Sequence, residues 1–180
     1  MRLLLLPLLL VALAGCALQP SGLRELQAQE GTQELQTTFI VVRHAEKSAA
    51  AEHAQDPPLD QDGQARAQAL AQTLAEVPLQ AVYSTPTRRT RETAAPVAAA
   101  MGLEVRDYDP GLAPSELATM LHIRHAGDTV LLVGHSNTVP GIVTALCACP
   151  VDPLTEEDYG DLYLVRLSAD GEATMERGRF

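Results

Sequence analysis

An arginine and a histidine at positions 43 and 44 directly follow an apolar run, residues 39–42, that has the composition of a strand. In an open α/β sheet, ligands bind at the carboxyl ends of the strands. Arg43 would place a permanent positive charge there, and the imidazole of His44 could act as a nucleophile. The pair therefore indicates chemistry on a phosphoryl group.

Two further loops carry polar residues at the same kind of position. Residues 84–94 read Ser-Thr-Pro-Thr-Arg-Arg-Thr-Arg-Glu-Thr-Ala after a short strand-like run, and residues 134–138 read Gly-His-Ser-Asn-Thr after an unbroken apolar run. Each loop is predicted to lead directly into a helix, and a helix N-terminus favours anions. Because parallel strands end at one edge of a sheet, we expect all three loops to meet there.

The elements that must position these loops alternate along the chain. Apolar runs predict strands at 39–42, 80–83, 103–107 and 128–133, and helical spacing predicts helices at 62–77, 87–101, 114–124 and 138–146. Alternating residues at 162–167 and 173–177, around a turn at 169–171, predict a terminal hairpin. This order predicts one layered α/β/α domain over residues 38–180, with a mainly parallel central sheet.

The three motifs, taken in this order, resemble a known family. Arg-His after the first strand, Ser-x-Pro-x-x-Arg-x-x-x-Thr-Ala after the second and Gly-His-Ser after a later strand resemble the histidine phosphatase superfamily, which has the phosphoglycerate mutase-like fold. The resemblance covers about residues 39–167. The form Arg-His-Ala-Glu-Lys and the small size of the chain resemble the short phosphatase branch. The implied activity is hydrolysis of phosphoric monoesters or related phosphates through a phosphohistidine.

The resemblance implies roles for four side chains. His44 would be the nucleophile that becomes phosphorylated, while Arg43, Arg89 and His135 would bind the phosphoryl oxygens. Arg89 is chosen over Arg88 because it stands at the arginine position of the family pattern. Phosphoryl transfer mainly needs positioning and charge neutralisation, which such groups supply, so we expect no metal ion and no cofactor. Further candidates for substrate binding are Lys47, Ser136 and Asn137.

The proton donor to the leaving group is harder to place. In larger relatives it is an acid after the third core strand, where this chain offers Asp109 first and Asp107 second. Glu46 is an alternative, although it could instead brace Lys47 or Arg89. Without a donor, phosphoramidates and acyl phosphates would be better substrates than simple alkyl phosphates, because an alkoxide leaves slowly when it is not protonated.

Two other functions stay open at this point. Residues 134–138 resemble the Gly-x-Ser-x-Gly elbow of serine hydrolases, with Ser136 as the nucleophile. Against that interpretation, Thr138 stands where the second glycine belongs, and no histidine follows His135 in the chain. The other alternative is a non-catalytic envelope lipoprotein that keeps the pocket only to bind a phosphorylated ligand, which the lack of a clear proton donor motivates.

The first 37 residues read as a leader and a tether. Arg2 precedes an apolar stretch too short to span a bilayer, and residues 13–16, Leu-Ala-Gly-Cys, resemble the lipobox of bacterial lipoproteins. That resemblance implies a signal peptide at 1–15, lipidation of Cys16 and a tether at 16–37. We expect an extracytoplasmic domain, lipid-anchored to the bacterial cell envelope and facing the periplasm from the outer membrane if there are two membranes. Envelope or scavenged phosphate esters would be its substrates.

The net charge of the chain limits the classes of partner that it is expected to bind. The chain carries a formal net charge of −10, and a strongly acidic protein is a poor candidate for binding nucleic acid. We therefore expect a small phosphorylated substrate, a membrane contact through the lipid anchor at Cys16 and no nucleic acid partner. The sequence does not indicate the oligomeric state.

Cys147, Cys149, His122 and His125 have redox-active or metal-binding side chains and lie outside the motifs. Cys147 and Cys149 are separated by one residue, a spacing that rarely meets disulfide geometry, so we expect two small residues that end a helix. A disulfide or a partner-linked thiol stays open for them. His122 and His125 are expected to be solvated helix residues rather than ligands.

Overall fold

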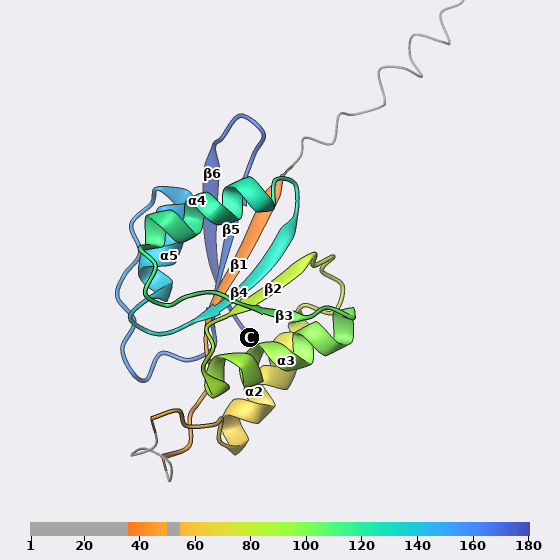
Figure 1. Ribbon diagram of the computed structural model, residues 1–180, viewed down its shortest axis with the longest axis vertical. Coiled ribbons are helices and arrows are strands. Elements are labelled where there is room, and N and C mark those ends of the chain that lie inside the picture. The colour runs from red at the N-terminus through yellow and green to blue at the C-terminus, as the bar shows by residue number, and fades with distance from the viewer. Residues whose placement is uncertain (1–35, 50–54) are drawn as a thin grey trace, which may run out of the picture. The chain divides into compact units, whose positions relative to one another are not determined.

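A computed structural model describes residues 36–49 and 55–180 of the chain (Figure 1). These residues form a six-stranded sheet with helices on both of its faces. The predicted signal peptide, Cys16 and nearly all of the predicted tether lie outside the described residues. None of the helices within the described ranges is both long enough and apolar enough to cross a membrane.

The sheet is mainly parallel, as the sequence predicts. Its strand order is β3-β2-β4-β1-β5-β6, and the first four of these strands run parallel to one another. The last two strands form an antiparallel hairpin that adds to the edge beside β1. The strands are β1 (Thr37–Arg43), β2 (Ala81–Ser84), β3 (Val105–Asp107), β4 (Thr129–Gly134), β5 (Asp161–Leu167) and β6 (Ala173–Arg179).

Four helices connect the strands, and they divide between the two faces of the sheet (Figure 1). They are α2 (Gln61–Thr73), α3 (Arg88–Met101), α4 (Pro114–Arg124) and α5 (Val139–Cys147). Three of them begin and end within one residue of the predicted bounds, but α2 ends four residues early. Tight turns follow it, with the Val77 amide bonded to the Leu74 carbonyl. Pro78 comes next, and a proline disfavours helical backbone in the residue before it.

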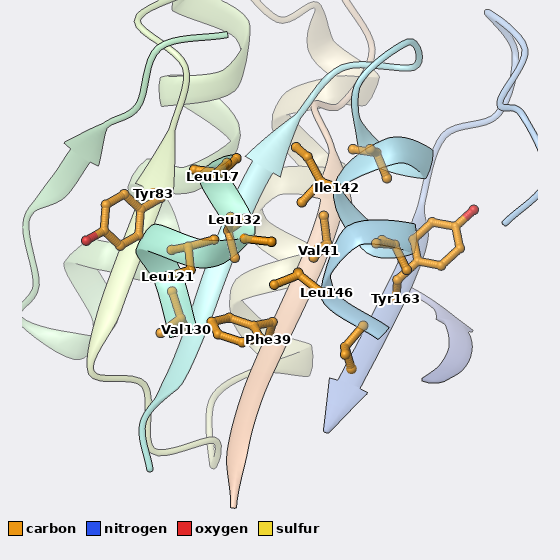
Figure 2. Close-up of a cluster of buried hydrophobic side chains, with 14 of the residues drawn as sticks. Phe39, Val41, Tyr83, Leu117, Leu121, Val130, Leu132, Ile142, Leu146 and Tyr163 are labelled. Carbon is orange, nitrogen blue, oxygen red and sulfur yellow. The ribbon is translucent and has the colours of Figure 1, made fainter. Parts of the chain in front are cut away.

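The apolar run of β1 is unbroken because its side chains point alternately to the two faces of the sheet and both faces are covered. Phe39 and Val41 pack with residues of α4 and α5 on one face, in the cluster drawn in Figure 2. Ile40 and Val42 pack with residues of α2 and α3 on the other face. A strand that is covered on both faces needs apolar residues at every position.

The prediction that His125 is solvated is wrong. Its side chain is buried at the end of α4, where one ring nitrogen lies 3.0 Å from the Tyr83 hydroxyl and the other 2.9 Å from the Asp128 carboxylate. The helix ends at Arg124, and the chain turns there toward β4, which brings His125 under the sheet. Both ring nitrogens are therefore occupied by neighbours within the fold, in keeping with the expectation that this residue is not a ligand.

The preferred interpretation of the two cysteines is also corrected. The structure joins Cys147 and Cys149 in a disulfide, with their Cα atoms 5.1 Å apart, a separation that disulfides commonly span. The residue between them, Ala148, has a positive φ of 53°. This left-handed turn after the last residue of α5 brings the two cysteines together, and sequence spacing alone does not reveal it.

Candidate active site

The three predicted loops meet at one edge of the sheet because β4 lies between β1 and β2. The amide of His44 donates to the carbonyl of Gly134 over 2.9 Å, which fastens the end of β1 to the end of β4. The rings of His44 and His135 lie with their centroids 5.3 Å apart. Arg89, near the beginning of α3, lies beside His135. The structure thus brings together histidines and an arginine from three separate strand–helix junctions.

His44 is positioned as a neutral nucleophile. Its Nδ1 lies 2.7 Å from the carbonyl oxygen of Ala45, and because a carbonyl can only accept, Nδ1 carries the proton and Nε2 keeps a free lone pair. Burial lowers the pKa of His44 to about 3. The hydrogen bond to Ala45 opposes that shift, and the nearby charges of His135, Arg43 and Arg89 add to it. The ring is therefore unprotonated at neutral pH.

His135 is held between two partners. The Arg89 guanidinium donates to His135 Nδ1 over 3.4 Å, so His135 Nε2 carries the proton and donates to the Thr85 hydroxyl over 2.9 Å. The pKa of His135 is lowered to about 4, chiefly by burial and then by the charges of Arg89 and Arg43, against which Asp56 acts. His135 is therefore neutral at neutral pH, with its one proton on Nε2, and it adds no second histidine charge next to the nucleophile.

Arg43 is the most buried charged residue of the site, with 1% of its surface exposed. Its Nη1 donates to the backbone carbonyls of Thr155, Glu156 and Asp158 over 2.8, 3.0 and 3.1 Å. The guanidinium carbon also lies 4.0 Å from the centre of the Tyr159 ring. Within the described residues, its buried Nε has no hydrogen-bond partner. Arg43 therefore braces the segment before β5.

Glu156 is a member of this site that sequence reasoning missed. Its carboxylate accepts from the Ser136 hydroxyl over 2.9 Å and from Arg43 Nη2 over 3.3 Å, and it lies 3.6 Å from Lys47 Nζ. The hydrogen bond from Ser136 and the charges of Arg43 and Lys47 lower its pKa. Asn137, another predicted substrate-binding residue, lines a cavity of about 170 Å³ together with residues of the loop after β3. The only sequence signal for Glu156 was an acidic run ahead of the terminal hairpin.

Asp56 was also missed. Both of its carboxylate oxygens accept from the backbone amide of Arg88, at 2.9 and 3.1 Å, at the beginning of α3. The same carboxylate lies 3.7 Å from Arg89. The side chain of Arg88 instead pairs with Glu92 one turn along the exposed helix, at 3.3 Å. Of the two neighbouring arginines, Arg89 is thus the one that faces His135.

The hydroxyl of Thr93 explains why a threonine follows the arginine in this motif. It accepts from the amide of Ala45 over 3.0 Å and donates to the carbonyl of Arg89 over 2.7 Å. Thr93 is fully buried, so both bonds are shielded from water. One side chain therefore ties the loop that carries the nucleophile to the helix that carries the second arginine.

The expected partners of Glu46 are wrong. Its carboxylate accepts from the guanidinium of Arg66 over 2.8 and 2.9 Å, rather than bracing Lys47 or Arg89. The reason is the close packing of α2 on the loop: a Cβ at Gly63 would lie 2.2 Å from the Glu46 carbonyl oxygen. That contact places the helix, and with it Arg66, directly against Glu46.

The other predicted proton donors also have partners away from the histidines. Asp109 accepts from the amide of Gly111 over 2.8 Å and borders the same cavity as Asn137. Asp107 forms an exposed ion pair with Arg91. Neither carboxylate makes a hydrogen bond to the site histidines or to their arginines among the described residues. Within the described residues, the acids of the loop after β3 are thus engaged by Gly111 and Arg91 rather than by the histidines.

The serine hydrolase interpretation finds no Ser–His pair in the described part of the chain. The Ser136 hydroxyl donates to Glu156, and both ring nitrogens of His135 are engaged by Thr85 and Arg89. Over residues 36–49 and 55–180, no three His, Cys, Asp or Glu side chains gather in the manner of a metal site.

The chain is similar to proteins of known fold. A family model described as histidine phosphatase superfamily (branch 1) matches residues 39–113. Among solved structures, the protein histidine phosphatase SixA in complex with tungstate is 20% identical over 79% of this chain and 96% of that one, with a TM-score of 0.62. YhfR of Bacillus stearothermophilus is 21% identical over 77% and 94%, also with a TM-score of 0.62. A phosphoserine phosphatase from Entamoeba histolytica is 16% identical over 80% of this chain and 98% of that one, with a TM-score of 0.61. No curated protein matches the chain.

Proposed function

Residues 39–113 match the family model of the histidine phosphatase superfamily and the chain has the phosphoglycerate mutase-like fold, and from that premise we propose that it is a member of this superfamily and a phosphohydrolase that works through a phosphohistidine on His44. Its substrate is a phosphomonoester or a related phosphate. Arg43, Arg89 and His135 bind the phosphoryl group, and the reaction proceeds without a metal ion. Positioning and charge neutralisation by these side chains supply what phosphoryl transfer needs most.

The observation that carries this proposal is the state of His44. Its Nδ1 proton is held by the Ala45 carbonyl, so Nε2 keeps its lone pair, and burial prevents protonation at neutral pH. In the first step, a bond forms between Nε2 and phosphorus while the bond from phosphorus to the ester oxygen breaks. In the second step, water attacks phosphorus, the bond to Nε2 breaks, and inorganic phosphate leaves with His44 restored.

The test is hydrolysis of an activated aryl phosphate by the full chain in detergent and EDTA, beside a His44→Ala variant. We expect turnover by the parent and none by the variant. Acid-labile, alkali-stable phosphate should become attached to the parent and not to the variant. A Ser136→Ala variant is the control, and it should keep His44-dependent turnover. Full activity in His44→Ala would refute the mechanism, while loss of all activity in Ser136→Ala alone would favour a serine nucleophile.

A phosphate-binding function without turnover is the second candidate, because none of the predicted acids is presented to His44. It predicts competition by inorganic phosphate for a bound phosphorylated ligand, with no hydrolysis across leaving groups of widely different acidity. His44-dependent hydrolysis of even the most activated substrate would exclude it.

We also propose that the protein is anchored to the outside of the bacterial cell envelope. The support is the sequence of residues 13–16, Leu-Ala-Gly-Cys, after an apolar stretch, which would be lipidated at Cys16. Its substrates would then be phosphate esters of the envelope or of the surroundings. A Cys16→Ser variant should move from the membrane fraction to the soluble fraction, and an unchanged distribution would refute the anchor.

A further inference from the structure

The segment between α5 and β5 places a carboxylate at the candidate active site. Glu156 contacts groups from two of the three loops: Arg43 and Lys47 from the loop after β1, and Ser136 from the loop after β4. Its side chain is 70% exposed, whereas Arg43 beneath it is 1% exposed. The carboxylate therefore lies on the solvent side of the cationic cluster, anchored but able to move.

An alkyl phosphate needs a proton donor for its leaving oxygen, and among the described residues the acids of the loop after β3 have other partners. Asp107 pairs with Arg91 at the surface, and Asp109 caps its own turn. Taking the proposed function as the premise, we propose that Glu156 is the general acid that protonates the leaving oxygen, and that it then acts as the base for the attacking water.

The position of Glu156 relative to the nucleophile suits this role. His44 is 4% exposed and forms the floor of the site. In-line displacement places the leaving oxygen on the side of phosphorus opposite to His44 Nε2, and therefore toward the mouth. The Glu156 side chain, 70% exposed beside the buried Arg43, lies on the solvent side of the site. Tyr159 of the same segment has its ring centroid 6.2 Å from that of His44, so the segment borders the nucleophile itself.

Glu156 can gain a proton when substrate binds, because the carboxylate and the phosphoryl group interact with the same cations. In the structure, Glu156 is held in its ionised form by Ser136, Arg43 and Lys47. A phosphoryl group that enters the site brings negative charge to the same cations, which weakens their hold on the carboxylate and raises its proton affinity. A substrate bound as its monoanion carries the proton needed.

Each step then conserves atoms and charge. As the bond from phosphorus to the ester oxygen breaks, the electron pair left on that oxygen takes the proton of the Glu156 carboxyl group. In the second step, the Glu156 carboxylate takes a proton from water while the water oxygen bonds to phosphorus and His44 Nε2 leaves. The proton returns to Glu156, which is ready for another cycle or can release it to solvent.

The experiment compares two substrates with the full chain and its Glu156→Gln variant. The substrates are para-nitrophenyl phosphate, whose leaving group needs no proton, and glycerol 2-phosphate, whose leaving group does. We expect kcat/KM, which reports the steps up to formation of the phosphohistidine, to fall by about 100-fold or more on glycerol 2-phosphate and by less than about fivefold on the nitrophenyl ester. Because the second step is common to both substrates, any loss of the base shows in kcat on both and does not affect this comparison. Glu157→Gln is the control, because Glu157 is exposed and its side chain makes no hydrogen bond or ion pair within the described residues.

Other results would overturn the inference in distinct ways. An equal loss of kcat/KM on both substrates would mean that Glu156 only positions the site. A lower KM and a higher kcat/KM on both would mean that its carboxylate competes with the substrate for Arg43 and Lys47. Unchanged turnover of glycerol 2-phosphate, or a parent chain that cleaves only the nitrophenyl ester, would also overturn it. Failure of the proposed function would be visible separately, as a parent chain without His44-dependent turnover of either substrate.

Discussion

Replacing Arg43 with methionine should cost the protein stability as well as activity, whereas the same change at Arg89 should cost activity alone. Both arginines are proposed to bind the phosphoryl group, but they lie in different surroundings. Arg43 is buried and donates to backbone carbonyls of residues 155, 156 and 158. The side chain of Arg89 is 19% exposed, and its polar contacts within the described residues are with the side chains of His135 and Asp56.

The size of the effect follows from the contacts of Arg43. Its Nη1 has two hydrogens for three carbonyls, so we count two hydrogen bonds from a charged donor, each worth about 1.5 kcal/mol or more. The pair with the exposed Glu156 carboxylate adds at most about 1 kcal/mol because solvent screens it. Since the freed carbonyls can regain water when the segment relaxes, we expect a net loss near 3 kcal/mol in the free energy of unfolding for Arg43→Met.

The assay is urea unfolding of the two variants beside the parent chain, followed by circular dichroism. With a slope of about 2 kcal/mol per molar urea, Arg43→Met should lower the midpoint by about 1.5 M. Arg89→Met should stay within about 1 kcal/mol of the parent, because its contacts are long and partly exposed. Both should lose on the order of 100-fold or more in kcat, as expected when a donor to the phosphoryl group is removed.

Equal stability of Arg43→Met and Arg89→Met would refute this reasoning. It would mean that the carbonyls of residues 155–158 do not depend on the guanidinium for their placement. Wild-type activity in Arg43→Met, with the expected loss of stability, would instead restrict Arg43 to a structural role and contradict its part in the proposed function.

Two more predictions concern the histidines and the packing of α2. The pKa of His44 is held at about 3 and that of His135 at about 4, against 6.5 for a free histidine. Neither ring should therefore titrate by NMR between pH 5 and 8, and a titration midpoint near 6.5 for either ring would contradict the burial. The free energy of unfolding should decrease as pH falls from about 6.5 to about 4, because the unfolded chain binds more protons than the folded chain in that range. Gly63→Ala should destabilise the chain by about 1–3 kcal/mol, because the new methyl group meets the Glu46 carbonyl. Gly178→Ala is its control, since a Cβ there meets nothing within 4 Å, and equal melting temperatures for the two variants would refute the contact.

The order of the helices and strands could be predicted because it follows from local patterns of apolar residues in the sequence. The unbroken apolar run of β4 predicts a strand, and the spacing of apolar residues in α3 predicts a helix. Helix α3 ends at Met101, with Gly102 in the left-handed conformation. The boundaries of an element were predicted less well where they depend on adjacent residues rather than on hydrophobic periodicity. At α2, the last predicted turn gives way to tight turns ahead of Pro78.

The candidate site was predicted only as far as its motifs reach. His44, Arg89 and His135 stand at strand ends, where topology alone brings them together. Asp56 and Glu156 stand in irregular segments without a motif, and their positions depend on contacts across the fold. Polar side chains in such segments give no periodic signal, so no reading of neighbouring residues could assign them partners.

The amino-acid sequence by itself determined the layered α/β/α architecture, the parallel core of the sheet and the edge at which its three motifs meet. These follow from hydrophobic periodicity and from the geometry of parallel strands, which are local or general rules. The tertiary structure alone decided which carboxylates reach the cations: Glu46 to Arg66, and Glu156 to Arg43 and Lys47. An ion pair forms between whichever charges packing brings within reach, and that distance is set by the whole fold rather than by any stretch of the chain.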